Sequence, residues 1–148
     1  MRRATEADLD AIVALLADDE LGRTRERPGD PRYAAAFAAI DRDPNQLLAV
    51  CERDGEIVGC LQLTFIPGLA RLGALRGQIE GVRIAASQRG EGLGREMLRW
   101  AIEECRARGC VLVQLTSDKR REDALRFYAS LGFVDSHEGL KLDIAPEA

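Results

Sequence analysis

A glycine-rich turn is the sequence feature that most limits how this 148-residue chain can fold. Residues 88–94 read Gln-Arg-Gly-Glu-Gly-Leu-Gly, between an apolar segment at 76–84 and a helix-periodic segment at 92–108. Glycines at every second position free backbone N–H groups to converge on an anion at a helix N-terminus, where the helix dipole is positive. The turn therefore predicts either an anion-binding loop or a plain glycine turn between a strand and a helix.

Two other phosphate-binding loops fit this turn poorly. A P-loop ends in Gly-Lys-Ser/Thr, whereas here Gly94 is followed by Arg95 and Glu96. A dinucleotide-binding loop has the spacing Gly-x-Gly-x-x-Gly, whereas this loop has Gly-x-Gly-x-Gly. Binding of ATP or NAD is therefore not expected.

The hydrophobic pattern predicts alternating helices and strands in a mixed α/β chain. Helical spacing predicts helices over 6–20 with Thr5 as the cap, from Pro31 onward, over 92–108 and over 122–131. The dipeptide Asp54-Gly55 predicts a tight hairpin turn. The expected strands lie at 46–53, at 56–66, at 76–84, after Gly109, and as a pair within 133–144.

Composition excludes several classes of protein. The 21 basic and 25 acidic residues leave a net charge of −4, so neither a nucleic-acid partner nor a membrane partner is expected. No apolar run approaches the ~20 residues of a membrane span, and no signal-peptide stretch is seen, which predicts a cytoplasmic protein. The length predicts a single domain, 1–148. Four cysteines without Cys-x-x-Cys spacing predict reduced thiols and no metal: Cys51, Cys60, Cys105 and Cys110.

Residues 89–94 match the pattern Gln/Arg-x-x-Gly-x-Gly/Ala, and residues 124–133 match the block Ala-x-x-x-Tyr-x-x-x-Gly-Phe. With these two motifs, the chain resembles the GNAT superfamily of N-acetyltransferases. The order of elements is similar over essentially the whole chain. The resemblance implies a GNAT-like α/β (α+β) fold, with a mixed, mostly antiparallel central sheet flanked by helices. It also implies that this sheet splays between the strand at 76–84 and the strand at 110–117.

The resemblance implies an acetyltransferase that moves an acetyl group from acetyl-CoA to an amine, by direct attack in a ternary complex. The cofactor-binding positions that it implies are Val82, Arg83, Ile84, Arg89, Gly90, Glu91, Gly92, Leu93, Gly94, Arg95 and Arg121. Many members carry asparagine where this chain has Arg121. That side chain is therefore expected either to meet the 3′-phosphate or to be solvated.

Two residues are expected to transfer protons in this reaction. An alkylammonium group with a pKa near ~10 must lose a proton before it can attack a thioester. The resemblance implies that Glu80 accepts this proton, directly or through water, and that Tyr128 protonates the departing thiolate. Strand alternation predicts that Glu80, Val82 and Ile84 share one face, and we expect Glu80 to be buried near Leu63 and Ile79.

The acceptor site is the least specified part of the sequence. If the strands pair face to face, Gln62, Thr64 and Gln78 line a groove with Glu80, and the alternative is a solvated outer face. The resemblance implies that the charged loop from Arg23 to Arg32 covers that groove. A small-molecule amine is the expected acceptor, while a protein acceptor and a homodimer stay open. The alternative function is a non-enzymatic acyl-CoA sensor or protein-interaction module on the same scaffold.

Overall fold

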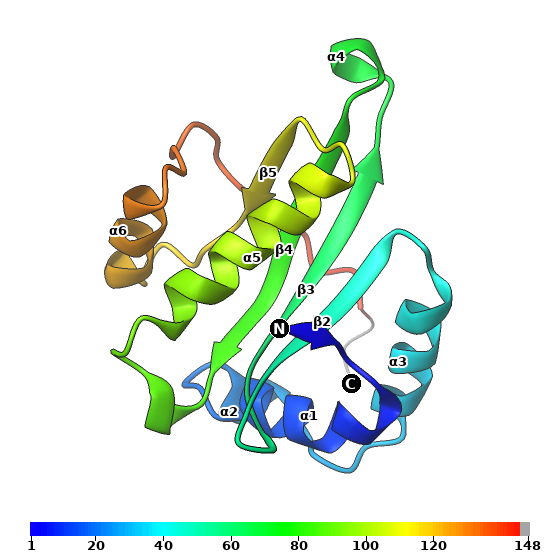
Figure 1. Cartoon of the computed structure of the whole chain (residues 1–148), viewed down its shortest axis with the longest axis vertical. Coiled ribbons are helices and arrows are strands. Elements are labelled where there is room, and N and C mark those ends of the chain that lie inside the picture. The colour runs from blue at the N-terminus through cyan, green and yellow to red at the C-terminus, as the bar shows by residue number, and fades with distance from the viewer. Residues whose placement is uncertain (146–148) are drawn as a thin grey trace. The chain divides into compact units, whose positions relative to one another are not determined.

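The computed structural model describes residues 1–145, which form two compact units that divide after Leu115. The first unit is built on a five-stranded sheet in the order β1-β2-β3-β4-β5 (Figure 1). The strands are β1 (Arg2–Arg3), β2 (Gln46–Arg53), β3 (Glu56–Pro67), β4 (Leu75–Ile84) and β5 (Leu112–Leu115). Neighbours are antiparallel except β4 and β5, which are parallel. The predicted mixed, mostly antiparallel sheet is confirmed.

The hairpin between β2 and β3 forms where Asp54-Gly55 predicts it. Asp54 has a φ of 51° and Gly55 a φ of 79°, and both are left-handed, as the tightest hairpin turns require. Arg53 pairs with Glu56 across the turn. Strand β1 is too short to show a period in the sequence and was not predicted.

Helices cover both faces of the sheet. The helices of the first unit are η1 (Glu6–Asp8, 3₁₀), α1 (Leu9–Ala17), α2 (Gly22–Arg25), α3 (Arg32–Arg42), α4 (Ala70–Gly73), η2 (Ala86–Gln88, 3₁₀) and α5 (Leu93–Ala107). Helix α5 packs on one face, because a Cβ added at Gly59 or Gly77 would meet Met97 or Cys105. On the other face, residues of α1 and α3 form a buried cluster with the sheet: Ile12, Leu15, Phe37, Val50 and Cys60.

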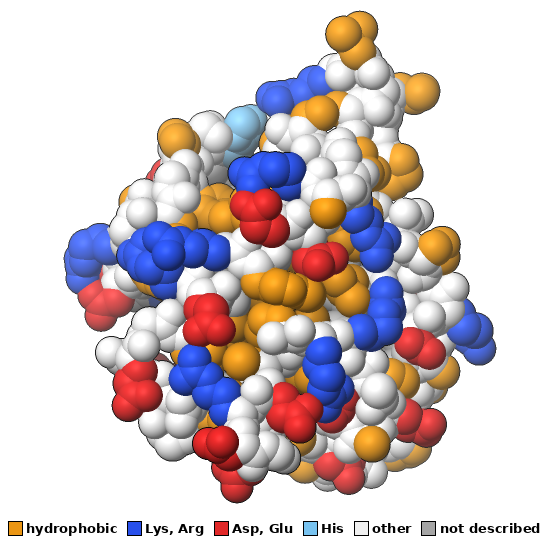
Figure 2. All heavy atoms as spheres, in the orientation of Figure 1, with side chains coloured by type: hydrophobic (Ala, Val, Ile, Leu, Met, Phe, Trp, Pro, Cys, Tyr) orange, Lys and Arg blue, Asp and Glu red, His pale blue; other side chains and the backbone are white. Residues whose placement is uncertain are grey.

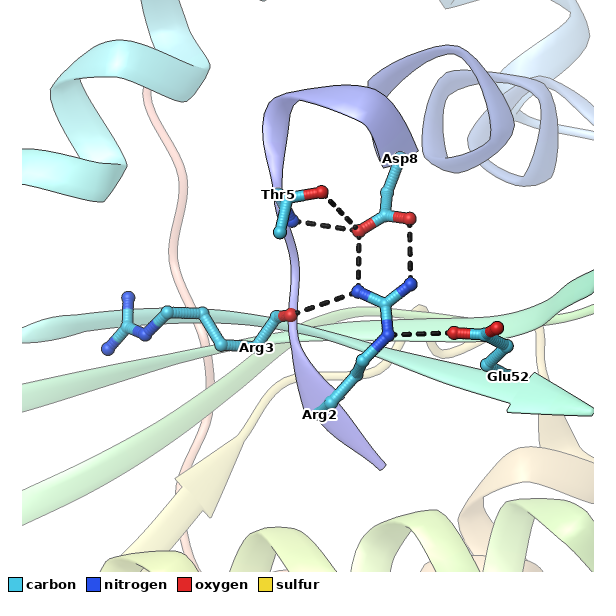
Figure 3. Close-up of polar contacts among 5 residues, drawn as sticks. All are labelled: Arg2, Arg3, Thr5, Asp8 and Glu52. Carbon is cyan, nitrogen blue, oxygen red and sulfur yellow. Dashed lines mark hydrogen bonds and ion pairs between the residues drawn. The ribbon is translucent and has the colours of Figure 1, made fainter. Parts of the chain in front are cut away.

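The first predicted helix begins as a 3₁₀ turn and ends earlier than expected. It begins as η1 and continues as α1 only to Ala17, so the span 6–20 was three residues too long. Thr5 stands before it as predicted, and its backbone N–H donates to Asp8 Oδ2 at 2.8 Å. Arg2 donates two hydrogen bonds to the same carboxylate, and its Nε donates to Glu52 Oε2 at 2.8 Å (Figure 3). These contacts fasten the start of the helix to the edge of the sheet.

The second unit contains α6 (Glu122–Ser130), near the predicted span 122–131. The predicted strand pair within 133–144 is wrong: no strand follows α6 among the residues described up to 145. Leu140, Leu142 and Ile144 alternate with charged residues, and all three are exposed. Alternation alone creates no strand, because a strand also needs a partner for its backbone hydrogen bonds.

Charges of both signs are mixed over the surface seen in Figure 2, where Lys and Arg side chains alternate with Asp and Glu side chains. This face shows no broad basic field of the kind that nucleic-acid binding requires. None of the helices in residues 1–145 has the length and apolar character that crossing a bilayer demands.

Candidate active site

The polar residues predicted on β3 and β4 lie on one face of the sheet. The register pairs Gln62 with Glu80 and Thr64 with Gln78, and directly paired residues of an antiparallel ladder point to the same side. Cys60 belongs to the same side of β3, and it packs in the cluster with α1. The four side chains therefore have the arrangement that the groove hypothesis needs, on the face opposite α5.

Three further residues extend this group, and sequence reasoning missed them. Gln46 Oε1 accepts from Gln62 Nε2 at 2.8 Å and from Thr64 Oγ1 at 3.0 Å. Gln114 Nε2 donates to Gln78 Oε1 at 2.8 Å, and Arg76 Nη1 lies 3.5 Å from Gln114 Oε1. We call the seven residues the polar row: Gln46, Gln62, Thr64, Arg76, Gln78, Glu80 and Gln114.

Glu80 ends a chain of hydrogen bonds within the polar row. Gln78 Nε2 donates to Glu80 Oε1, and Gln78 itself accepts from Gln114. The expected burial of Glu80 is wrong: the residue is exposed, and Ile79 and its partner Leu63 point to the opposite face. Its carboxylate is therefore accessible to a solute and is oriented by an amide donor.

A β-bulge follows Glu80 directly. β3 advances two positions, from Cys60 to Gln62, while β4 advances three positions, from Arg83 to Glu80. Gly81 absorbs the extra residue with a φ of 61°. The bulge reverses the alternation, so Ile84 pairs with Gly59 on the α5 face and the expected common face with Glu80 is wrong for Ile84.

The sheet opens at the same place. The parallel ladder between β4 and β5 ends at the pair Ile79 and Leu115, although β4 continues to Ile84. The backbone on the β5 side of residues 80–84 therefore has no strand partner in the described part of the chain. This is the splay that the resemblance implies, and it leaves backbone N–H and C=O groups of β4 without a ladder partner beside the polar row.

The glycine turn ends at the N-terminus of α5. Gly92 caps this 15-residue helix with a φ of 84°, and Gly90 has a φ of 83°. A Cβ at either glycine would meet no atom within 4 Å, and no side chain caps the helix. The first turn of a helix has N–H groups without an intrahelical acceptor. Such donors at a helix N-terminus suit an anion.

The other predicted cofactor positions differ in what they can offer. Leu93 is buried in the core, so only its backbone is available there. Arg83 pairs through Nε with Asp19 Oδ2 at 2.8 Å, which commits its side chain to the end of α1. Arg89 donates from Nε to the carbonyl oxygen of Ile84 at 3.1 Å and stays half exposed. Glu91 is exposed in the turn, and Arg95 lies in the first turn of α5.

The cysteines are unsuited to nucleophilic catalysis. All four are free thiols, and Cys51, Cys60 and Cys105 are buried. Burial raises the pKa of Cys60 to about 12 and that of Cys105 to about 12, so neither forms a thiolate at neutral pH. No group of three His, Cys, Asp or Glu residues within 1–145 is placed to hold a metal ion.

The second unit carries Tyr128 and Arg121. Tyr128 is half-buried in α6, and its ring lies 5.4 Å from that of Phe127 and 5.9 Å from that of Phe133. Arg121 stands at the N-cap of α6 and is exposed. Neither arrangement tests the predicted roles, which stay predictions.

A cavity of about 320 Å³ opens within the charged loop that was expected to cover the acceptor groove. Its lining comes from the end of α2, the connection and the start of α3: Arg25, Arg27, Asp30, Arg32, Tyr33 and Ala36. The Arg32 guanidinium donates two hydrogen bonds to the Asp30 carboxylate. The Tyr33 hydroxyl donates to Glu26 Oε2 at 2.7 Å. The loop is thus held by the ion pair of Asp30 with Arg32 and by the hydrogen bond from Tyr33 to Glu26.

The chain was compared with known protein families, curated proteins and solved structures, and each comparison found similar proteins. The model of the acetyltransferase (GNAT) family matches residues 9–133. An aminoalkylphosphonate N-acetyltransferase of Salmonella typhimurium is 34% identical, over 93% of this chain and 86% of that protein. A glucosamine 6-phosphate N-acetyltransferase of Trypanosoma brucei brucei is 38% identical over 61% of this chain and 59% of that protein. A crystal structure described as a transcriptional regulator from Bacillus halodurans C-125 is 52% identical, with a TM-score of 0.93 over 97% of each chain.

Proposed function

The chain belongs to the acetyltransferase (GNAT) family and is an N-acetyltransferase, and we propose that it acetylates the primary amine of a small molecule with acetyl-coenzyme A as the donor. One observation supports this most strongly. The splay of β4, the exposed carboxylate of Glu80 and the uncapped N-terminus of α5 all belong to the single segment 79–93. This segment supplies a backbone edge, a base and an anion site.

The donor fits the residues present. Backbone N–H groups of the turn and of the first turn of α5 are suited to a pyrophosphate, because the helix dipole and Arg89 add positive charge there. The free edge of β4 at Val82 to Ile84 is suited to the amide groups of a pantetheine arm. Acetyl-coenzyme A supplies an acyl thioester, whose carbonyl carbon is the electrophile.

Glu80 is proposed as the base. It takes a proton from the ammonium group, directly or through a water, so that the nitrogen lone pair can attack the thioester carbonyl. Backbone N–H groups near the splay stabilise the oxyanion, the attacking nitrogen releases its second proton to water, and the C–S bond then breaks. Tyr128 is proposed to protonate the released thiolate. Because the thiols of Cys60 and Cys105 stay protonated, direct transfer is favoured over an acyl-enzyme at either residue.

We also propose a class for the acceptor. The two curated relatives are named for an aminoalkylphosphonate and for glucosamine 6-phosphate, and each of these molecules has an amine and an anionic phosphorus group. The identity of 34% over almost the whole chain supports an acceptor of that kind here. The proposed substrate is therefore a small amine that also carries a phosphonate or phosphate group.

Calorimetric titration of the full chain tests the donor. We expect acetyl-coenzyme A and free coenzyme A to bind, and ATP and NAD not to compete. A screen of small amines by thiol release then tests turnover. Absence of coenzyme A binding by folded protein would overturn the proposal.

A second candidate function is a regulator that binds acyl-coenzyme A without turnover. It is favoured by one observation, the description of a 52% identical protein as a transcriptional regulator. The two functions differ in the same assay: a sensor binds acetyl-coenzyme A but releases no thiol with any amine of the screen.

A further inference from the structure

We propose that Arg76 determines acceptor specificity by binding the anionic group of an acceptor whose amine lies at Glu80. This inference rests on the proposed function, since it assumes that Glu80 receives the amine. Arg76 was absent from the sequence-based candidates, and the structure introduces it as a member of the polar row.

The first argument is placement on one strand face. Arg76, Gln78 and Glu80 occupy alternate positions of β4, before the bulge at Gly81 reverses the alternation. At ~3.3 Å per residue, the Cα atoms of Arg76 and Glu80 are separated by roughly 13 Å along the strand. Both side chains therefore border the same surface, from the same rigid element.

The second argument is the contact chain between the two charges. Arg76 Nη1 reaches Gln114 Oε1, Gln114 donates to Gln78, and Gln78 donates to Glu80. Only two amide side chains thus separate the guanidinium from the carboxylate. The polar row presents a cation at one end and an anion at the other. A molecule with an ammonium group and a phosphonate or phosphate group has the complementary pair of charges.

The third argument is the donor capacity of Arg76. A guanidinium has five N–H donors in a fork that matches phosphate and phosphonate oxygens. The contact from Nη1 to Gln114 is long, at 3.5 Å, so it is a weak hydrogen bond that an anion can displace. Arg76 is half-buried, which limits the screening of its charge by water.

The arginines of the charged loop are the competing choice. Arg32 is already held by Asp30, and the cavity beside it is lined entirely by α2, α3 and their connection. That lining includes no residue of β4, whereas Arg76 shares its strand with the proposed base. The geometry therefore favours Arg76.

Steady-state kinetics of the full-length enzyme test the assignment. Wild type, Arg76→Gln and Arg76→Lys are compared with 2-aminoethylphosphonate and with ethanolamine, a primary amine of similar length that has no anionic group. Loss of charge-assisted hydrogen bonds is expected to raise KM for the phosphonate about 10- to 100-fold in Arg76→Gln. The preference for phosphonate over ethanolamine falls by the same factor, KM for acetyl-coenzyme A stays constant, and Arg76→Lys recovers part of the preference.

Control variants distinguish a wrong assignment of Arg76 from a wrong proposed function. Arg99→Gln removes an exposed arginine of α5, on the opposite face, and is expected to keep the wild-type preference. An unchanged preference in Arg76→Gln overturns the inference, and a loss of preference in Arg25→Gln/Arg27→Gln instead assigns the anion to the loop cavity. Absence of thiol release from wild type with every amine contradicts the proposed function itself.

Discussion

Replacing Asp8 with asparagine is expected to destabilise the first unit by an amount that depends on pH. The carboxylate is 7% exposed and accepts four hydrogen bonds, two from Arg2, at 2.7 and 2.9 Å, and two from Thr5, at 2.8 and 3.2 Å. The Arg2 guanidinium holds the pKa of this carboxyl well below its usual range, against the opposing effect of burial. Asparagine keeps the shape but turns an NH₂ group toward a cationic donor.

The magnitude follows from these contacts. A hydrogen bond to a charged group contributes about 1.5–3 kcal/mol and a neutral one about 1, and an unsatisfied donor costs about 1–3 kcal/mol. Arg2 is 41% exposed, so water compensates part of the loss on its side. We expect Asp8→Asn to lower the free energy of unfolding by about 2–3 kcal/mol. At ~2–4 °C per kcal/mol for a chain of this length, Tm falls by roughly 4–12 °C.

The sign of the pH dependence is set by the lowered pKa. A carboxyl whose folded-state pKa lies below the unfolded value contributes stability above the unfolded pKa, near ~4, and loses it as the pH falls further. The Tm difference between wild type and Asp8→Asn is therefore largest at pH 7 and shrinks below pH ~4.

Thermal unfolding followed by circular dichroism at pH 7, 5, 4 and 3 measures both effects. Glu52→Gln is the matched control, because Glu52 contacts the same guanidinium but is 40% exposed, and we expect a much smaller change of Tm. A Tm difference for Asp8→Asn that is below 1 °C, or constant from pH 7 to pH 3, would refute the reasoning.

Four further substitutions test the site. Glu80→Gln is expected to lower kcat by about 10²- to 10⁴-fold and to remove the acidic limb of the pH–rate profile; a surviving limb means another base. Gln78→Leu removes the amide donor of Glu80 and should lower kcat about tenfold. Gly92→Ala forces a Cβ into a left-handed conformation, costs about 1–2 kcal/mol and should weaken acetyl-coenzyme A binding in calorimetry. Tyr128→Phe should lower kcat more than the affinity for acetyl-coenzyme A, and unchanged turnover would remove Tyr128 from the mechanism.

Local signals in the sequence predicted much of the fold. The Asp54-Gly55 turn, the glycine cap of α5 and the apolar stripe of that helix each depend on residues close in the chain. Local conformational preference and side-chain period are encoded at that range, so these elements form where expected. The strand pair within 133–144 was wrong for the converse reason: its alternation was local, but a strand requires a partner that local sequence does not specify.

The candidate site divides in the same way. The glycine turn and Glu80 were found from sequence because each belongs to a motif or lies at a fixed offset from one. Gln46, Arg76 and Gln114 were missed because only the register between strands brings them together, over separations of 16 to 38 residues. A signal was present in the alternation of Arg76, Gln78 and Glu80, but it did not show which face these residues share with β3 and β5.

The sequence by itself determined the resemblance to the family, the glycine turn before α5 and the order of the longer elements from β2 to α6, because these depend on short-range patterns of residue type. The tertiary structure decided which side chains meet. The bulge at Gly81 turns Ile84 away from the face of Glu80, and the register joins Arg76 to Glu80 through two amides. One extra residue in a strand reverses the facing of every residue beyond it. Pairing with distant strands sets that register, so the face of the active site is a property of the folded sheet.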